Sequence, residues 1–192
     1  MLDPSTGTIS GIPLNVETAD FTVQVEDAAA ETATQDLSLG VLPTPVTDLM
    51  MTLSTDNASE VYVNGFLVGT TSDWKEAGVF TVPLQAGSNV VAIKGTNSSG
   101  AAGLLAELSW ASDTAVTDTA WKVSASAGVG WETVGFDDSA WSIATSYGFY
   151  GASPWLQRVV GFPIDSPAQW IWTEDNFSDT NAYLRYNIIV SE

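Results

Sequence analysis

Three groups of oxygen-bearing side chains are the first candidates for chemistry in this chain. The largest places four of them within six positions, at Glu174, Asp175, Asn176 and Asp179. Carboxylate and amide oxygens are the ligands that Ca²⁺ prefers, so this group predicts a calcium loop. It lacks the spacing and the glycine of an EF-hand, and a solvated acidic turn is the alternative. Asp56-Asn57 and Asp137-Asp138-Ser139 allow two interpretations as well, a cation or sugar contact or a self-stabilised turn.

Aromatic rings are the second kind of candidate, because a flat apolar ring can stack on the face of a pyranose. The chain has eight tryptophans. Five occur in strand-like patterns and are predicted to lie in the core: Trp110, Trp121, Trp141, Trp170 and Trp172. The other three occur among Gly, Ser and Asp and are predicted to be exposed: Trp74, Trp131 and Trp155.

The segment Tyr147–Trp155 is a run of aromatic residues separated by glycines, and it is the best ligand-contact region by composition. Glycines between aromatic residues also allow a loop to pack against its own sheet, which is the alternative. We predict that the ligand-binding residues are Trp74, Trp131, Tyr147, Tyr150 and Trp155.

Composition excludes several classes of chemistry. The absence of Cys and His excludes thiol nucleophiles, Ser-His-Asp triads, and thiolate or imidazole metal sites. The 23 acidic and 5 basic residues give a net charge of −18, which repels nucleic acid and anionic lipid headgroups. No stretch is long and apolar enough for membrane insertion. No carboxylate pair is marked out for catalysis, so we predict a non-enzyme. The acidic composition has two explanations. The chain binds calcium, which is the expected cation, or the acidity only keeps the protein soluble.

Strand patterns recur along the chain, whereas helix patterns are nearly absent. Apolar and polar residues alternate between turn dipeptides such as Asn64-Gly65 and Ser99-Gly100, as expected for half-buried antiparallel strands. The predicted strands cover residues 20–26, 33–41, 60–63, 79–82, 89–93, 170–172 and 182–188. Hydrophobic residues make up 45% of the chain, enough for a core. We predict an all-β fold, an antiparallel β-sandwich or jelly roll.

Pro43 and Pro45 indicate a boundary, because two prolines in three residues favour an extended linker over a central strand. We divide the chain into residues 1–42, a linker at 43–46 and a main domain at 47–192. The first part is too short for an independent sandwich. We expect a tight turn, a short strand, a second turn and then a hairpin. A secretory leader begins with a charged and then an apolar stretch, whereas Asp3 and Pro4 here indicate a turn. We therefore expect this chain to be a piece of a longer protein.

The run Leu2-Asp3-Pro4-Ser5-Thr6-Gly7-Thr8-Ile9-Ser10-Gly11-Ile12-Pro13 resembles the bacterial Ig-like, cadherin-like repeats. The resemblance extends over about 40 residues and covers the second half of such a domain. It implies a spacer in a long surface or secreted protein. Half of an Ig-like domain has exposed edges, so we expect it to be completed by a neighbouring chain, docked on the main domain, or poorly ordered.

Three blocks of the main domain resemble the galactose-binding-like jelly roll, an accessory β-sandwich of bacterial glycosidases and adhesins. They are the hairpin around Tyr62-Val63-Asn64-Gly65, the block Phe136-Asp137-Asp138-Ser139-Ala140-Trp141, and Trp170-Ile171-Trp172 with Ala182–Tyr186. In the glycosidase modules the hairpin comes last, whereas here it comes first. We interpret this order as a circular permutation in which strand 182–190 pairs beside strand 48–55. The alternative is that the sequence spans the end of one copy of the domain and the start of a second, tandem copy.

These resemblances imply a non-catalytic carbohydrate-binding or adhesive module of a secreted or surface bacterial protein. The expected location is extracellular, and the expected partner is a neutral glycan or cell-surface polysaccharide, bound with calcium. Two alternatives remain open. One is a spacer or fibre subunit that shares strands with a neighbouring chain through the incomplete Ig-like segment. The other is an accessory domain of a larger glycoside hydrolase.

Overall fold

The regular structure of the chain is entirely β. The computed structural model describes residues 2–3, 5–9, 18–40 and 45–191, and it divides the chain into two compact units, Met1–Thr44 and Pro45–Glu192. No helix occurs among the described residues, so that part of the chain holds no helix able to cross a membrane. The predicted all-β fold is confirmed.

The smaller unit contains two strand pairs. Strands β1 (Leu2–Asp3) and β2 (Thr8–Ile9) are antiparallel and joined by a tight turn. In this turn Gly7 donates its N–H to the carbonyl of Asp3 and has a φ of 69°, a conformation that favours glycine. Strands β3 (Thr18–Glu26) and β4 (Thr32–Gly40) form the predicted hairpin. The predicted second turn, at Ser10–Pro13, and Val41 of the predicted strand 33–41 lie outside the described residues.

The hairpin of β3 and β4 leaves apolar side chains open to solvent. Val25, Leu37 and Leu39 are exposed, and Phe21 and Val23 are half-buried. No described residue of the smaller unit is buried. The described part of this unit therefore has no hydrophobic core of its own.

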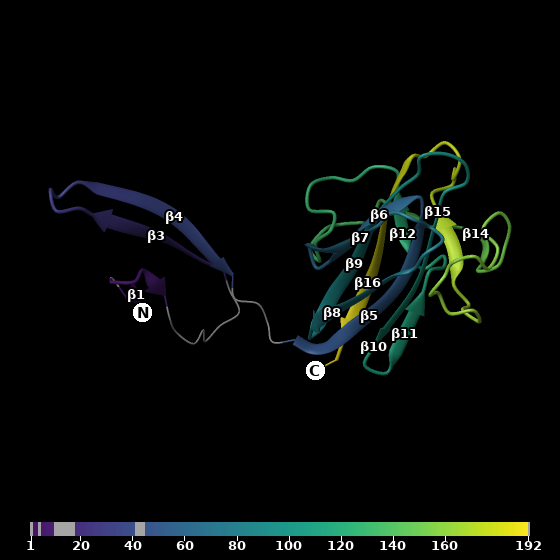
Figure 1. The fold of residues 1–192 in the computed structure, drawn as a ribbon, viewed down its shortest axis with the longest axis horizontal. Coiled ribbons are helices and arrows are strands. Elements are labelled where there is room, and N and C mark those ends of the chain that lie inside the picture. The colour runs from purple at the N-terminus through teal and green to yellow at the C-terminus, as the bar shows by residue number, and fades with distance from the viewer. Residues whose placement is uncertain (1, 4, 10–17, 41–44, 192) are drawn as a thin grey trace. The chain divides into compact units, whose positions relative to one another are not determined.

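The larger unit is a sandwich of two six-stranded sheets, seen as two layers in Figure 1. The first, which we call the β5 sheet, has the order β14 (Thr145–Phe149), β15 (Gln169–Trp172), β10 (Gly103–Trp110), β5 (Pro45–Asp56) and β8 (Gly78–Gln85), with β11 (Asp113–Val116) also paired to β10. The second, the β9 sheet, has the order β13 (Ser142–Ile143), β12 (Lys122–Ser124), β16 (Asn181–Val190), β9 (Gly87–Thr96), β6 (Ala58–Val63) and β7 (Phe66–Thr71). Neighbouring strands in both sheets are antiparallel.

Alternation along the strands builds the core between the two sheets. In β6, Val61 and Val63 are buried, while Glu60 and Tyr62 on the opposite face are half-buried. One core cluster joins residues of both sheets, including Leu53 of β5 and Ile93 of β9. Gly95 of β9 allows a close approach, because a Cβ atom there would lie only 2.4 Å from the ring of Trp172. The absence of a side chain at Gly95 thus makes room for this buried tryptophan.

A second buried cluster lies under the loop between β14 and β15. It contains Leu105, Tyr150, Trp155, Val159, Phe162, Ala168 and Trp170. The rings of Trp155 and Trp170 are stacked, with their centroids 4.5 Å apart. Burial of large aromatic rings supplies much of the stabilisation of a loop, so this segment is fixed by packing as well as by hydrogen bonds.

The predicted pairing of strand 182–190 with strand 48–55 is wrong. Strand β16 belongs to the β9 sheet, between β12 and β9, whereas β5 pairs with β8 and β10 in the other sheet. The ends of the two strands are nevertheless close. Pro45 pairs with Gln85 and Val190 pairs with Gly87, at either side of the turn that joins β8 to β9. The two ends of the larger unit therefore lie close together, as a circular permutation requires.

The predicted linker at residues 43–46 overlaps the first strand of the larger unit. Strand β5 begins at Pro45, a position where a proline removes no hydrogen bond from the middle of a sheet. Residues 43 and 44 lie outside the described residues. The turn at Asn64-Gly65 has positive φ at both residues, as expected for a tight hairpin turn between β6 and β7.

Candidate functional site

The loop of residues 125–141, between β12 and β13, covers the outer face of the β9 sheet. Register places Arg185 of β16 opposite Lys122 on one side and Ala92 on the other, and Ala92 is opposite Tyr62 of β6. These side chains point away from the core, yet Ala92 is fully buried and Arg185 is only 1% exposed. We therefore assign their burial to the loop.

Arg185 fastens this loop to the sheet. Its Nε atom donates to Oδ2 of Asp138 at 2.8 Å, and its Nη1 atom donates to the carbonyls of Trp131 and Thr133. The guanidinium also lies 5.3 Å from the ring centroid of Phe136. Arg suits this role because its planar group can donate several hydrogen bonds at once. Asp137 caps its own turn by accepting a hydrogen bond from the N–H of Ser139.

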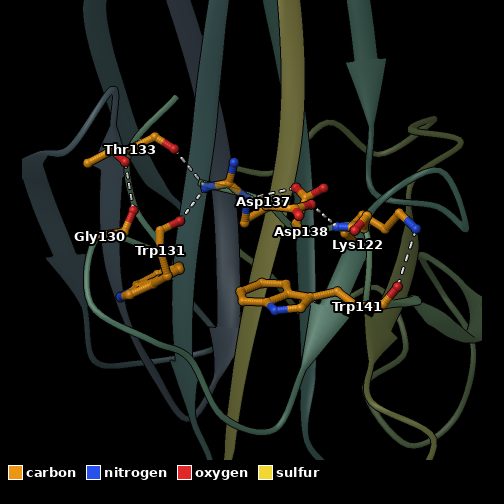
Figure 2. Close-up of polar contacts among 9 residues, drawn as sticks. Lys122, Gly130, Trp131, Thr133, Asp137, Asp138 and Trp141 are labelled. Carbon is orange, nitrogen blue, oxygen red and sulfur yellow. Dashed lines mark hydrogen bonds and ion pairs between the residues drawn. The ribbon is translucent and has the colours of Figure 1, made fainter. Parts of the chain in front are cut away.

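The anchored loop presents an aromatic cluster. The ring of Trp131 stacks on that of Trp141 at 6.5 Å and meets Tyr62 and Tyr183 edge-on at 5.6 and 5.0 Å. Phe136 packs edge-on against Trp141 at 5.6 Å. Figure 2 shows the Trp131 and Trp141 rings side by side, next to the polar contacts that hold the loop. All five rings are half-buried, so part of this cluster remains accessible to a ligand.

A groove of about 310 Å³ adjoins this cluster, and Trp141 is one of its walls. The other lining residues come from β12, the two ends of the 125–141 loop, β13, the start of β14 and the segment after β15. Hydroxyl groups are supplied by Ser124, Ser142, Thr145 and Thr173. Carboxylates are supplied by Glu174 and Asp179. We call this cavity the Trp141 groove.

The charged side chains that line the Trp141 groove are both carboxylates. Glu174 and Asp179 form no ion pair within the described part of the chain, and no cationic side chain lines the cavity. Burial raises the pKa of the nearby Tyr147 hydroxyl, and the charges of Asp175, Asp179 and Glu174 raise the pKa further, against a hydrogen bond from Asn176. Lys122 lies outside the lining, and its Nζ donates to the carbonyl of Trp141 at 3.2 Å.

A second polar site lies at the end of β5, around Asp56 and Asn57. Asp56 is 9% exposed, and its carboxylate accepts hydrogen bonds from Trp155 Nε1 at 2.8 Å and Asn57 Nδ2 at 2.7 Å. Burial raises the pKa of Asp56, although the bond from Trp155 opposes this change. Asn57 Oδ1 accepts two hydrogen bonds from Ser98. The site is therefore a desolvated carboxylate that two neutral donors hold in place.

The structure separates the five predicted ligand-binding residues. Trp131 lies in the aromatic cluster, whereas the other four contact the second buried cluster. Trp74 is half-buried there, and Tyr147 is half-buried with its hydroxyl donating to the carbonyl of Thr173 at 2.8 Å. Trp155 is 1% exposed, so its predicted exposure is wrong, and Tyr150, predicted as a ligand-binding residue, is also buried. The loop folds back and buries them, since packed rings are more stable than hydrated ones.

The four side chains of the predicted calcium loop do not converge on one point. Glu174 and Asp179 line the Trp141 groove. Asp175 accepts hydrogen bonds from the N–H groups of Phe177 and Ser178, and the Ser178 contacts contribute most to lowering its pKa. Asn176 is buried and donates to the carbonyl of Ala102. Among residues 2–3, 5–9, 18–40 and 45–191, no three acidic side chains converge in a cluster able to hold a metal ion.

Sequence reasoning missed Trp141 as a site residue. Its place in a strand-like block, and the resemblance of that block to a turn with a core tryptophan, predicted that it would be buried. The ring instead lies half-buried beside Trp131 and lines the groove. The two acidic residues before it were a usable signal, because Asp138 pairs with an arginine on the outer face of the sheet.

Two comparisons place these units among known proteins. Residues 1–42 match a family model described as "Putative Ig domain". No curated protein matches the chain. Among solved structures, a lectin from Pleurotus ostreatus in complex with GalNAc is 26% identical over 76% of this chain and 41% of the lectin, with a TM-score of 0.57. The same lectin without ligand gives the same values.

An α-L-rhamnosidase from Streptomyces avermitilis, complexed with L-rhamnose, is also similar. It is 26% identical over 75% of this chain, with a TM-score of 0.56, and the matched region is 14% of the enzyme. The chain therefore spans less than half of the lectin and a small part of the rhamnosidase. These findings confirm the suspected composite of an Ig-like segment followed by a β-sandwich related to lectin and glycosidase structures.

Proposed function

We propose that the larger unit is a non-catalytic carbohydrate-binding module and that the Trp141 groove is its sugar site. The observation that carries this proposal is the composition of the groove, in which a half-buried tryptophan adjoins four hydroxyls and two carboxylates. An apolar ring can stack on a sugar face while polar groups bond to its hydroxyls. The likeness to a GalNAc-bound lectin supports the same function.

The size of the site and its lining residues favour binding over catalysis. A volume of about 310 Å³ lies at the lower end of the range for small-molecule pockets, which suits a short saccharide. The only ionisable groups among its lining residues are Glu174 and Asp179, and the chain has no cysteine or histidine that could join them in catalysis. We assign these carboxylates to ligand binding.

Glycan binding by wild type and two single variants tests the proposal. Wild type is screened on a glycan array, and isothermal titration then measures the affinity of the best saccharide for W141A and F66A. Phe66 is an exposed aromatic residue at the tip of the β6–β7 hairpin, outside the groove, and therefore serves as the control. We expect W141A to lose at least tenfold in affinity and F66A to match wild type. A blank array, or equal affinities for W141A and wild type, would contradict the proposal.

Calcium dependence, in this proposal, resides at Asp56 instead of at residues 174–179. A carboxylate that is buried without a cationic partner is unfavourable unless it gains a proton or a metal ion. Asp175, by contrast, is an exposed carboxylate that accepts hydrogen bonds from two backbone N–H groups, so it lacks the desolvation that favours a cation at Asp56.

Terbium luminescence tests the calcium proposal, since Tb³⁺ replaces Ca²⁺ and is excited by a nearby indole. The indole of Trp155 contacts Asp56, so bound Tb³⁺ should emit when tryptophan is excited. We expect D56N to abolish the emission and the E174Q/D179N double variant to retain it. Emission that persists in D56N, or that disappears only in the double variant, would place the cation elsewhere.

The accessory-domain alternative is favoured by one observation. The rhamnosidase match covers three quarters of this chain but only 14% of the enzyme, as expected for one module of a larger protein. We propose that the Ig-like segment is a spacer that holds the binding module away from a surface or from a catalytic neighbour. A secreted or cell-surface location, with the bound polysaccharide outside the cell, is part of this proposal.

A further inference from the structure

The Trp141 groove differs from a simple neutral sugar site in the charge of its walls. Its lining contains two carboxylates, from Glu174 and Asp179, and no lysine or arginine. Both carboxylates lack ion-pair partners within the described residues. The whole chain carries a net charge of −18, so its long-range field acts in the same direction.

From this arrangement we infer that the groove selects sugars that bear a free, protonated amine over their neutral and acidic counterparts. The inference rests on the proposed function, and it names the ligand class. An ammonium group can donate to carboxylate oxygens with charge assistance, while the ring of the sugar packs against Trp141. A uronic acid would bring a third carboxylate into the groove and would be repelled.

The geometry of the two carboxylates supports this assignment. Glu174 lies two residues after the end of β15 and Asp179 two residues before the start of β16, so both belong to the segment between these strands, and both line the cavity. That segment is held by bonds that leave these two carboxylates free. The Asp175 carboxylate accepts hydrogen bonds from the N–H groups of Phe177 and Ser178. Asp179 takes part through its backbone, because its carbonyl accepts a hydrogen bond from Trp172 Nε1 at 3.1 Å.

Four sugars of one stereochemistry isolate the effect of charge. Galactose, galactosamine, N-acetylgalactosamine and galacturonate are titrated into the wild-type chain at pH 6.5 and low salt, and the same set is repeated with the gluco isomers. We expect galactosamine to bind about fivefold more tightly than galactose, as estimated for an exposed ion pair. Acetylation of the amine should remove the gain, galacturonate should bind most weakly, and 0.3 M salt should reduce the differences.

Charge-neutralising variants locate the effect. In E174Q/D179N the ratio of galactosamine affinity to galactose affinity should fall from about five to about one. The control is D113N/D165N, which removes the same charge at two exposed positions outside the groove and should keep the wild-type ratio. Equal affinities for galactosamine and galactose in wild type, or a preference that survives in E174Q/D179N, would overturn the inference. Absence of binding by all these sugars would also overturn the inference, whereas a blank glycan array would overturn the proposed function itself.

Discussion

The indole Nε1 of Trp155 donates a hydrogen bond to Oδ2 of Asp56 at 2.8 Å, although the two residues are 99 positions apart in the chain. This bond connects the loop between β14 and β15 to the end of β5. It also gives the buried carboxylate one of its two donors, the other being Asn57. The contact thus links the packing of the second buried cluster to the second polar site.

We predict that W155F lowers the free energy of unfolding more than W170F does. The two rings are stacked on each other and equally buried, but Trp170 Nε1 has no hydrogen-bond partner among the described residues. The extra loss in W155F should be about 2 kcal/mol, the cost of leaving a buried carboxylate with one donor fewer. Urea unfolding measures both variants, and equal losses would show that the Asp56 bond adds nothing.

Asp56 should also leave a signature in the pH dependence of stability. Burial raises its pKa above the usual 3.8, so the folded state favours the protonated form. Its contribution is fully present below the unfolded-state pKa and is lost as pH rises through the folded-state pKa. We therefore expect wild type to lose stability relative to D56N between pH 3 and pH 6, measured in EDTA. A relative gain over that interval would contradict the raised pKa.

Replacement of Arg185 should release the loop of residues 125–141. Removal of one partner of a buried ion pair costs about 3 to 5 kcal/mol, and Arg185 also binds two carbonyls. We expect R185M to lower the free energy of unfolding by about 3 kcal/mol or more. The control is K122M, on the neighbouring strand, which removes one hydrogen bond to Trp141 and should cost about 1 kcal/mol. Similar losses in the two variants would argue against the anchoring role of Arg185.

Tyr62 should titrate at unusually high pH. Its hydroxyl donates to Glu60 Oε2 at 2.7 Å, and this bond is the main cause that raises its pKa to about 12. Stability from this raised pKa is present below about pH 10 and is lost as pH rises toward 12. Absorbance at 295 nm for wild type minus Y62F should show the ionisation, and E60Q should shift it toward 10. A wild-type step already near pH 10 would contradict the bond.

Seven of the strands could be predicted because each has a local signature, whereas β7, β10, β11, β12, β13 and β14 were not among the predicted strands. Alternation predicted β3, β4, β6, β8, β9, β15 and β16, and the Asn64-Gly65 dipeptide predicted the turn between β6 and β7. Their pairing could not be predicted as reliably. Strand β16 has apolar side chains suited to either sheet, and only three-dimensional packing decides that it lies between β12 and β9.

The site was harder to predict because exposure of a tryptophan depends on distant contacts. Trp155 lies in a glycine-rich loop, yet the partners that bury it are Asp56 and Trp170, both remote in sequence. Trp141 lies in a strand-like block, yet Arg185 and Asp138 place its loop on the outside of the sheet. Glu174 and Asp179 were identified as ligands from their residue types, but the sequence did not show that they face the same groove as Trp141.

Indole NMR during a sugar titration tests the central claim most directly. The eight tryptophan Nε1–H signals are resolved in a two-dimensional spectrum, and single Trp→Phe variants assign the signals of Trp141, Trp74 and Trp155. The best-binding saccharide should shift the Trp141 signal in a saturable manner and leave the Trp74 and Trp155 signals unchanged. Saturable shifts at Trp74 or Trp155 without a change at Trp141 would place the sugar at the Asp56 end of the sandwich and contradict the assignment of the Trp141 groove.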